Sequence, residues 1–172
     1  MMGSSCDAVA RPVPSSDGAS RRMRAQRTAS TAPELALRRE LWRRGLRYLV
    51  DAPLPVPGVR RRADLLFRGA KVAVFVDGCF WHACPEHGTV PKANAWYWGP
   101  KLARNAERDR DTDRRLAEAG WQAVRVWEHD DPEEAAGQVE KAIKDSGWVG
   151  QSGAAAGARK TPAGPTVGPR PT

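Results

Sequence analysis

The sequence predicts an α/β sandwich in which helices pack around a mixed central sheet. Short apolar runs and segments with helical spacing follow one another in the order α-β-β-β-α-β-α. A hairpin joins the second and third predicted strands, and a long helix bridges the third and fourth. A hairpin and a bridging helix in the same sheet indicate that the sheet is mixed.

The first helix is predicted to begin near Thr31. Thr31 and Glu34 form a capping-box pattern, and Gly45 is a stop signal. Three apolar residues share one face: Leu37, Leu41 and Trp42. Four arginines lie on the other face: Arg38, Arg39, Arg43 and Arg44. A basic face of this kind is either solvated or contacts phosphates, and the sequence leaves both interpretations open.

Two apolar runs around a glycine turn predict the hairpin. A first strand over residues 47–51 and a proline-rich connection come before it. Residues 63–67 and 71–76 are the two runs, and Arg68 and Gly69 form the turn between them. We therefore expect three strands before the long helix.

The long polar helix is predicted over residues 95–119 and ends at Gly120. Its apolar positions have helical spacing: Trp98, Leu102 and Ala106. Residues 122–127 are the fourth predicted strand. Asp131 as a cap and Pro132 in the first turn then open a final helix.

The 172 residues are enough for one domain with a substantial core. Both ends of the chain have no apolar periodicity. Residues 1–22 mix small residues with arginines, and residues 148–172 are rich in Gly, Pro and Ala. We expect two disordered tails, the first of them basic, around a domain that spans residues 23–147.

The formal net charge of +8 and the isoelectric point of about 10.0 favour a polyanionic partner. Nucleic acid is the leading candidate, and an anionic membrane surface is the second. No segment approaches the roughly 18 apolar residues of a membrane span, so we expect a cytoplasmic protein. We also expect it to be a monomer. Three cysteines are an odd number, which favours metal binding or a buried thiol over a disulfide framework.

A cluster of metal-ligand residue types follows the predicted hairpin. Cys79, Cys84 and His87 are close enough for one loop to wrap a tetrahedral ion. His129 is the expected fourth ligand, and His82 is the alternative. Thiolates and imidazoles suit Zn²⁺, and a closed set of four ligands indicates a structural ion. The competing interpretation is a buried thiol or two beside ordinary surface histidines.

Acidic residues near the hairpin suggest a second, harder cation. Asp64 enters the second predicted strand and could bind Mg²⁺, or it could be a hairpin-end acid that accepts backbone amides. His82 is a candidate for activating a water, and Asp109 on the long helix could orient its ring. Glu34 is either the helix cap or a carboxylate that faces the same ion. The sequence pattern leaves each pair of interpretations open.

The motifs around these residues resemble a known family. Residues 74–82 read Val-Phe-Val-Asp-Gly-Cys-Phe-Trp-His, in order after an apolar strand. Further motifs are Pro33-Glu34-Leu35, Ala63-Asp64-Leu65, Pro91-Lys92, Tyr97-Trp98, Arg108-Asp109 and Val126-Trp127-Glu128-His129. On these motifs the chain resembles the very short patch repair (Vsr) DNA mismatch endonucleases, from about residue 23 to about residue 129.

The resemblance implies a restriction-endonuclease-like α/β fold with a zinc-bound loop. It also implies an enzyme that nicks double-stranded DNA 5′ to the thymine of a T:G mismatch, the lesion left when 5-methylcytosine deaminates. Asp64 matches the family's Mg²⁺ carboxylate, and Val76 could assist only through its backbone carbonyl. His82 matches the general base, Asp109 its support, and Glu34 a further active-site acid.

The resemblance also implies roles for the residues after the strand. Cys79 and the residues that follow match a structural zinc site, although His129 replaces a cysteine of the family. Three aromatic residues match a wedge that enters the base stack beside the mismatch, with core packing as the alternative: Phe80, Trp81 and Trp98. Three polar residues in the matched motifs are expected to contact DNA: Lys92, Lys101 and Asn105.

The sequence departs from the expected nuclease pattern at two points, and two alternative functions stay open. Asp77 is either a second metal ligand or a turn acid, and no lysine occupies the position expected of a general nuclease motif. One alternative is a restriction- or defence-associated nuclease of the same fold with a different DNA target. Another is a zinc-stabilised DNA-binding module without cleavage activity. Recruitment of mismatch-repair proteins is left open.

Overall fold

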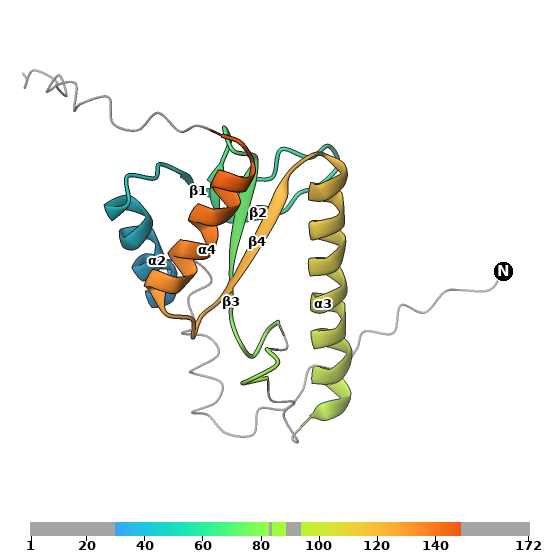
Figure 1. Ribbon diagram of the computed structural model, residues 1–172. Coiled ribbons are helices and arrows are strands. Elements are labelled where there is room, and N and C mark those ends of the chain that lie inside the picture. Colours follow the sequence, from blue (N-terminus) through green and yellow to red (C-terminus); the bar gives the residue numbers. More distant parts are fainter. Residues whose placement is uncertain (1–29, 83, 89–93, 149–172) are drawn as a thin grey trace, which may run out of the picture.

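The computed structural model describes residues 30–82, 84–88 and 94–148. Within these ranges the helices and strands follow the predicted order (Figure 1). Their bounds are α2 Ala32–Arg43, β1 Leu49–Pro53, β2 Arg62–Phe67, β3 Val72–Asp77, α3 Ala95–Glu118, β4 Gln122–Trp127 and α4 Pro132–Asp145. Lys92 and the two predicted tails, apart from Trp148, lie outside the described residues.

The strands form one four-stranded sheet in the order β1-β2-β3-β4. β2 pairs with β1 and with β3 in antiparallel fashion, whereas β3 and β4 are parallel. α3 makes the crossover between β3 and β4, as a parallel pair requires. The predicted hairpin and mixed sheet are therefore confirmed, and the first strand lies slightly later than residues 47–51.

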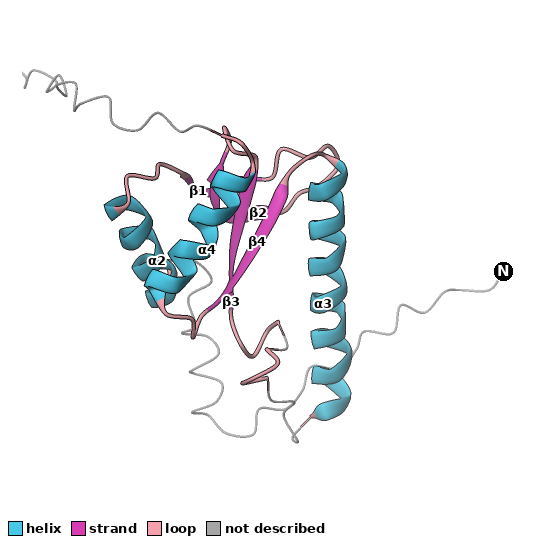
Figure 2. Ribbon diagram, viewed as in Figure 1, coloured by secondary structure: helices cyan, strands magenta, loops and turns pink. Residues whose placement is uncertain are grey.

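Helices cover both faces of the sheet (Figure 2). α2 and α4 pack on one face, where Leu41, Leu65 and Val139 belong to one core of buried side chains. α3 packs on the other face through Leu116, which lies in a second core with Leu66. Fully burying one such side chain stabilises a fold by about 1.5–3 kcal/mol, so the two cores hold the three layers together.

Strand β2 changes faces at Asp64. Residues two apart in a regular strand point to the same side of the sheet. Leu65 nevertheless packs in the core of α2 and α4, and Ala63 packs in the core of α3. In the β1–β2 pairing Ala63 and Leu65 each have a partner on β1, whereas Asp64 between them is not in the paired register. Asp51, which lies opposite Asp64, has a left-handed φ of +44°. This distortion places Asp64 at the border of the two cores.

Two details of α2 differ from the prediction. Thr31 is the N-cap residue, but its side chain makes no capping bond. The Glu34 carboxylate instead accepts the backbone N–H of Ser30 at 2.8 Å. Trp42, expected on the buried face, is 58% exposed, and the Arg47 guanidinium lies 3.7 Å from the centre of its ring. Each helical residue turns the chain by about 100°, which carries Trp42 away from the buried position of its neighbour.

The later helices have the predicted end signals. α3 ends at Glu118, and Gly120 after it has φ of +72°. The Asp131 carboxylate caps α4 by accepting the backbone N–H of Glu133 at 2.9 Å and that of Glu134 at 3.2 Å. None of the helices in the described ranges is long and apolar enough to cross a membrane.

Candidate active site and metal cluster

A polar cleft of about 410 Å³ opens beside β2, β3 and α3. Four side chains with acid-base chemistry line it: Asp64, Asp77, His82 and Asp109. Five arginines also line it: Arg60, Arg61, Arg62, Arg108 and Arg125. The cleft thus combines carboxylates that could hold a cation with guanidinium groups that could bind phosphate.

Asp64 faces the cleft and also accepts a backbone amide. Its Oδ2 atom accepts the N–H of Val76 from the neighbouring strand at 2.7 Å. Burial raises the pKa of Asp64 to about 6, and the negative charges of Glu34 and Asp77 act in the same direction. Repulsion between these acids disfavours the ionised form of Asp64, and a bound cation would offset that repulsion. The surroundings of Asp64 therefore fit a metal ligand.

Glu34 lies close enough to Asp64 for its charge to act on that carboxylate. It is 3% exposed, and it forms an ion pair with Arg38 one helical turn later. Its second oxygen accepts the backbone N–H of Ser30. The two interpretations of Glu34 are therefore compatible in space, because the residue both stabilises the start of α2 and lies near Asp64 of the polar cleft.

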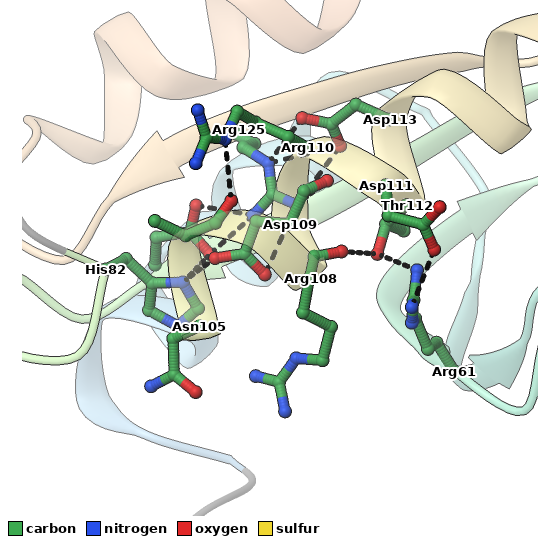
Figure 3. A network of polar contacts seen from close by, with 12 residues as sticks. Arg61, His82, Asn105, Arg108, Asp109, Arg110, Asp111, Thr112, Asp113 and Arg125 are labelled. Atoms are coloured by element: carbon green, nitrogen blue, oxygen red, sulfur yellow. Dashed lines mark hydrogen bonds and ion pairs between the residues drawn. The ribbon is translucent and has the colours of Figure 1, made fainter. Parts of the chain in front are cut away.

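His82 and Asp109 form a hydrogen-bonded pair, with the histidine after β3 and the acid on α3 (Figure 3). His82 Nδ1 lies 2.6 Å from Asp109 Oδ2 and 3.5 Å from Asp77 Oδ1. Burial lowers the pKa of His82, but the bond to Asp109 and the charge of Asp77 outweigh it and raise the pKa above its usual value. Because Nδ1 is engaged, Nε2 is the ring nitrogen left to accept a proton.

Asp77 is bound to Arg125, a residue that sequence reasoning missed. Arg125 Nη1 donates to both carboxylate oxygens of Asp77, at 2.8 and 3.1 Å. The two residues come from the parallel strands β3 and β4 and are 48 positions apart. An arginine between Val124 and Val126 in a strand with apolar neighbours was the available signal, because such a charge needs a partner.

Four side chains gather into a compact metal-ligand set after β3 and β4: Cys79, Cys84, His87 and His129. One ligand atom from each lies within 4.8 Å of all the others. Burial and the neighbouring Cys84 raise the pKa of Cys79 to about 11, so a cation would be needed to hold Cys79 as a thiolate. Two sulfurs and two imidazoles at this spacing fit a tetrahedral ion.

His129, rather than His82, completes the metal cluster. His129 Nδ1 lies 3.0 Å from Cys79 Sγ and 3.9 Å from Cys84 Sγ, whereas His82 Nδ1 is bound to Asp109. Glu128 fixes the same loop by accepting the backbone N–H of Cys79 at 2.8 Å. The residue before His129 thus holds the backbone of Cys79 in place.

An aromatic cluster joins the segment after β3 to the start of α3. Phe80, Trp81 and Trp98 make mutual edge contacts with ring centres 5.0 to 5.8 Å apart. Lys101 Nζ lies 5.1 Å from the ring centres of Trp81 and Trp98, and Asn105 donates to the backbone oxygen of Trp81 at 3.2 Å. Trp98 is buried, while Phe80 and Trp81 are partly exposed. Among the described residues, the two sheet cores include neither Phe80 nor Trp81.

Comparison with known proteins assigns the family. Residues 15–86 match the family model described as DNA mismatch endonuclease Vsr. The Type II nicking enzyme V.NaeI of Lentzea aerocolonigenes is 50% identical over 129 residues, which cover 74% of this chain and 78% of that protein. The chain belongs to the Vsr endonuclease family. DNA mismatch endonuclease Vsr of Escherichia coli (strain K12) is 38% identical over 114 residues, 63% of this chain and 68% of that protein.

A third relative supports the same assignment. The Type II nicking enzyme V.NmeDIP of Neisseria meningitidis serogroup C is 36% identical over 110 residues, 63% of this chain and 72% of that protein. The Vsr assignment confirms the resemblance seen in the sequence, and it makes the protein an endodeoxyribonuclease. The mixed sheet with helices on both faces agrees with the nuclease fold that membership of the Vsr family implies. A binding module without cleavage activity is correspondingly disfavoured.

Proposed function

We propose that this Vsr-family enzyme nicks double-stranded DNA on the 5′ side of the thymine in a T:G mismatch. Such mismatches arise when 5-methylcytosine deaminates. The observation that carries the proposal is the meeting of Asp64 and the His82–Asp109 pair in one cleft. The aromatic residues Phe80 and Trp81 directly precede His82 in the chain. The cleft supplies groups for hydrolysis, and the aromatic cluster supplies a means of recognising a weakened base step.

Asp64 and the backbone carbonyl of Val76 are the groups that would hold Mg²⁺, and water and phosphate oxygens would complete its preferred oxygen shell. When bound, Mg²⁺ would withdraw negative charge from the scissile phosphate. The pKa of Asp64, raised by burial and by Glu34 and Asp77, supports this assignment because a cation stabilises the ionised carboxylate. Glu34 would add negative potential to the site rather than a direct ligand, because its oxygens bind Arg38 and Ser30.

His82 would take a proton from the attacking water through Nε2, because Nδ1 is bound to Asp109. The water oxygen then forms a bond to phosphorus, the bond to the leaving O3′ breaks, and that oxygen takes up a proton from solvent. Asp109 stabilises the imidazolium that forms and fixes the ring in one orientation. General base catalysis of this kind contributes about 10²–10⁴ to the rate.

The aromatic cluster would recognise the mismatch by entering the base stack. Phe80 and Trp81 are partly exposed, and Trp98 is the buried ring that supports both. Unstacking a base step costs a few kcal/mol, least where pairing is already faulty, and stacking on an aromatic ring returns about 1–3 kcal/mol per base. Lys101 beside these rings would hold the adjacent phosphate.

A structural Zn²⁺ would be held by the four residues of the metal cluster. These residues would fill all four coordination positions of the ion, which would leave no open position for chemistry. Its contribution would be to stiffen the loop that joins Cys79 to Cys84, which presents both the aromatic cluster and His82 to the DNA. Loss of the ion should therefore disturb binding and catalysis together.

A second function is a nicking or restriction-associated nuclease that does not require a mismatch. The observation that favours it is that V.NaeI and V.NmeDIP are both named Type II nicking enzymes. A mismatched duplex and its fully paired control separate the two functions. Equal nicking of both duplexes would support the second function, and a strong preference for the mismatch supports the first.

The catalytic assignment is tested by Asp64→Asn, which keeps the shape of the side chain and removes its charge. We expect nicking to fall below about one hundredth of the wild-type rate, while affinity for the duplex stays within about threefold. Asp51→Asn is a matched control, because Asp51 lies opposite on β1 and pairs only with Arg62 among the described residues. Wild-type cleavage by Asp64→Asn would remove Asp64 from the reaction.

A further inference from the structure

We propose that Arg125 is a positioning residue for His82: it binds the competing acid Asp77 and anchors the α3 segment that carries Asp109. This inference rests on the proposed role of His82 in activating water. Arg125 lies on β4 and binds both acids that neighbour the histidine, Asp77 and Asp109. In this role Arg125 acts through these two acids, both of which its guanidinium binds.

Arg125 joins three parts of the fold through its guanidinium group (Figure 3). Nη1 holds both oxygens of Asp77 at the end of β3, at 2.8 and 3.1 Å. Nε donates to Asp113 on α3 at 3.0 Å, and Nη2 donates to the backbone oxygen of Asp109 at 3.4 Å. The guanidinium carbon also lies 4.8 Å from the ring centre of Phe75. A flexible side chain is thereby fixed in one position between the sheet and α3.

The contact with Asp77 matters because His82 has two acidic neighbours. Nδ1 lies 2.6 Å from Asp109 and 3.5 Å from Asp77. Asp77 is 4% exposed, so its charge acts strongly on His82 unless a cation compensates it. Arg125 occupies both oxygens of Asp77 and leaves Asp109 as the hydrogen-bond partner of the ring.

The contacts with α3 matter because Asp109 must stay within hydrogen-bond distance of the ring. Asp113 lies one helical turn after Asp109, and Arg125 binds the side chain of the first and the backbone of the second. Loss of the guanidinium would leave the acids of β3 and α3 facing one another without the cation between them. The expected consequence is a shift of His82 toward Asp77 and away from its productive position.

The test compares three variants of the full-length protein on the duplex that the wild type cleaves best. Arg125→Met should lower kcat by about 100-fold and leave KM within about threefold, because misplacing a catalytic group by about 1 Å has an effect of this size. The double variant Asp77→Asn/Arg125→Met should recover at least about tenfold of the lost kcat, because it removes the uncompensated acid. Arg114→Met, an exposed arginine of α3 that pairs only with Asp111 among the described residues, should behave as wild type.

A second readout does not depend on cleavage. The Nδ1–H proton of His82, held by Asp109, should give a downfield imidazole resonance in proton NMR, and His82→Gln should assign it. We expect Arg125→Met to lose or shift this resonance and Arg114→Met to keep it. The double variant also guards against a folding failure, because it lacks the unpaired buried charge of the single variant.

Three results would overturn the inference. The first is a kcat for Arg125→Met within about threefold of wild type, and the second is an unchanged His82 resonance. The third is a double variant no more active than Arg125→Met, which would show that Arg125 does not act by compensating Asp77. A wild-type protein that nicks paired and mismatched duplexes equally would instead remove the mismatch function, while the role of Arg125 would still be measured on either duplex.

Discussion

Asp109→Asn perturbs the His82 pair with a minimal change, because asparagine keeps the size of the side chain and removes its charge. In the structure Asp109 Oδ2 lies 2.6 Å from His82 Nδ1, the distance of a strong charge-assisted hydrogen bond. Bonds to charged groups contribute about 1.5–3 kcal/mol, and about 1.36 kcal/mol corresponds to a factor of ten in rate. We therefore expect the single-turnover nicking rate to fall roughly 10- to 150-fold.

The same variant should shift the dependence of the rate on pH. Burial lowers the pKa of His82, and Asp109 and Asp77 together raise it above its usual value. A neutral imidazole accepts the proton, so the rate rises as the pH passes upward through this pKa. Without the charge of Asp109 the pKa of His82 falls, and the rising limb of the profile moves to lower pH, within about pH 5 to 8 where histidines titrate.

Single-turnover rates measured across this pH range provide the assay, with DNA affinity measured separately by fluorescence anisotropy. Asp111→Asn is the control, because Asp111 lies on the same helix but binds Arg61, Arg114 and Arg115 rather than His82. The control should keep its rate within about threefold, as is usual for partly exposed ion pairs. An unchanged rate for Asp109→Asn, or a rising limb displaced to higher pH, would refute the reasoning.

The remaining predictions concern the metal cluster, the DNA contacts and the core. Cys84→Ser should lower the zinc content found by metal analysis and the midpoint of thermal unfolding; a full zinc content would contradict its role as a ligand. Arg108→Met should reduce the salt slope of DNA binding by about 1, because Arg108 lines the cleft and each phosphate contact adds about one unit to the slope. Lys141→Met on α4 is the control and should leave the slope unchanged. Leu116→Ala should lower the free energy of unfolding by about 2–5 kcal/mol in urea titration, since Leu116 is 0% exposed.

Much of the fold could be predicted because its signals are local. Apolar runs of strand length, a glycine turn and a capped helix start each depend on a few neighbouring residues, and the structure contains all of these elements. Trp42 was wrongly predicted to be buried, because the burial of a residue at the edge of an apolar helix face depends on which elements pack against that face. The change of face in β2 at Asp64 was not predictable either, since it arises from pairing with β1.

In the site, too, the features with local sequence signals were predictable and those that depend on strand pairing were not. Cys79, Cys84 and His87 have the spacing of one metal loop, and the structure brings His129 to them from the end of β4. The choice of His129 over His82 depends on the parallel pairing of β3 with β4, which the sequence indicates only weakly. Arg125 was missed for the same reason, because its partner Asp77 becomes a neighbour only when the two strands align.

Mapping the nick on an end-labelled duplex tests the central claim most directly. The duplex carries one T:G mismatch, its control carries T:A at the same position, and each is incubated with Mg²⁺ and with a chelator. We predict a single Mg²⁺-dependent nick immediately 5′ to the mismatched thymine and none in the control. Equal nicking of both duplexes, or nicking that persists with the chelator, would contradict the proposal of a Mg²⁺-dependent mismatch endonuclease.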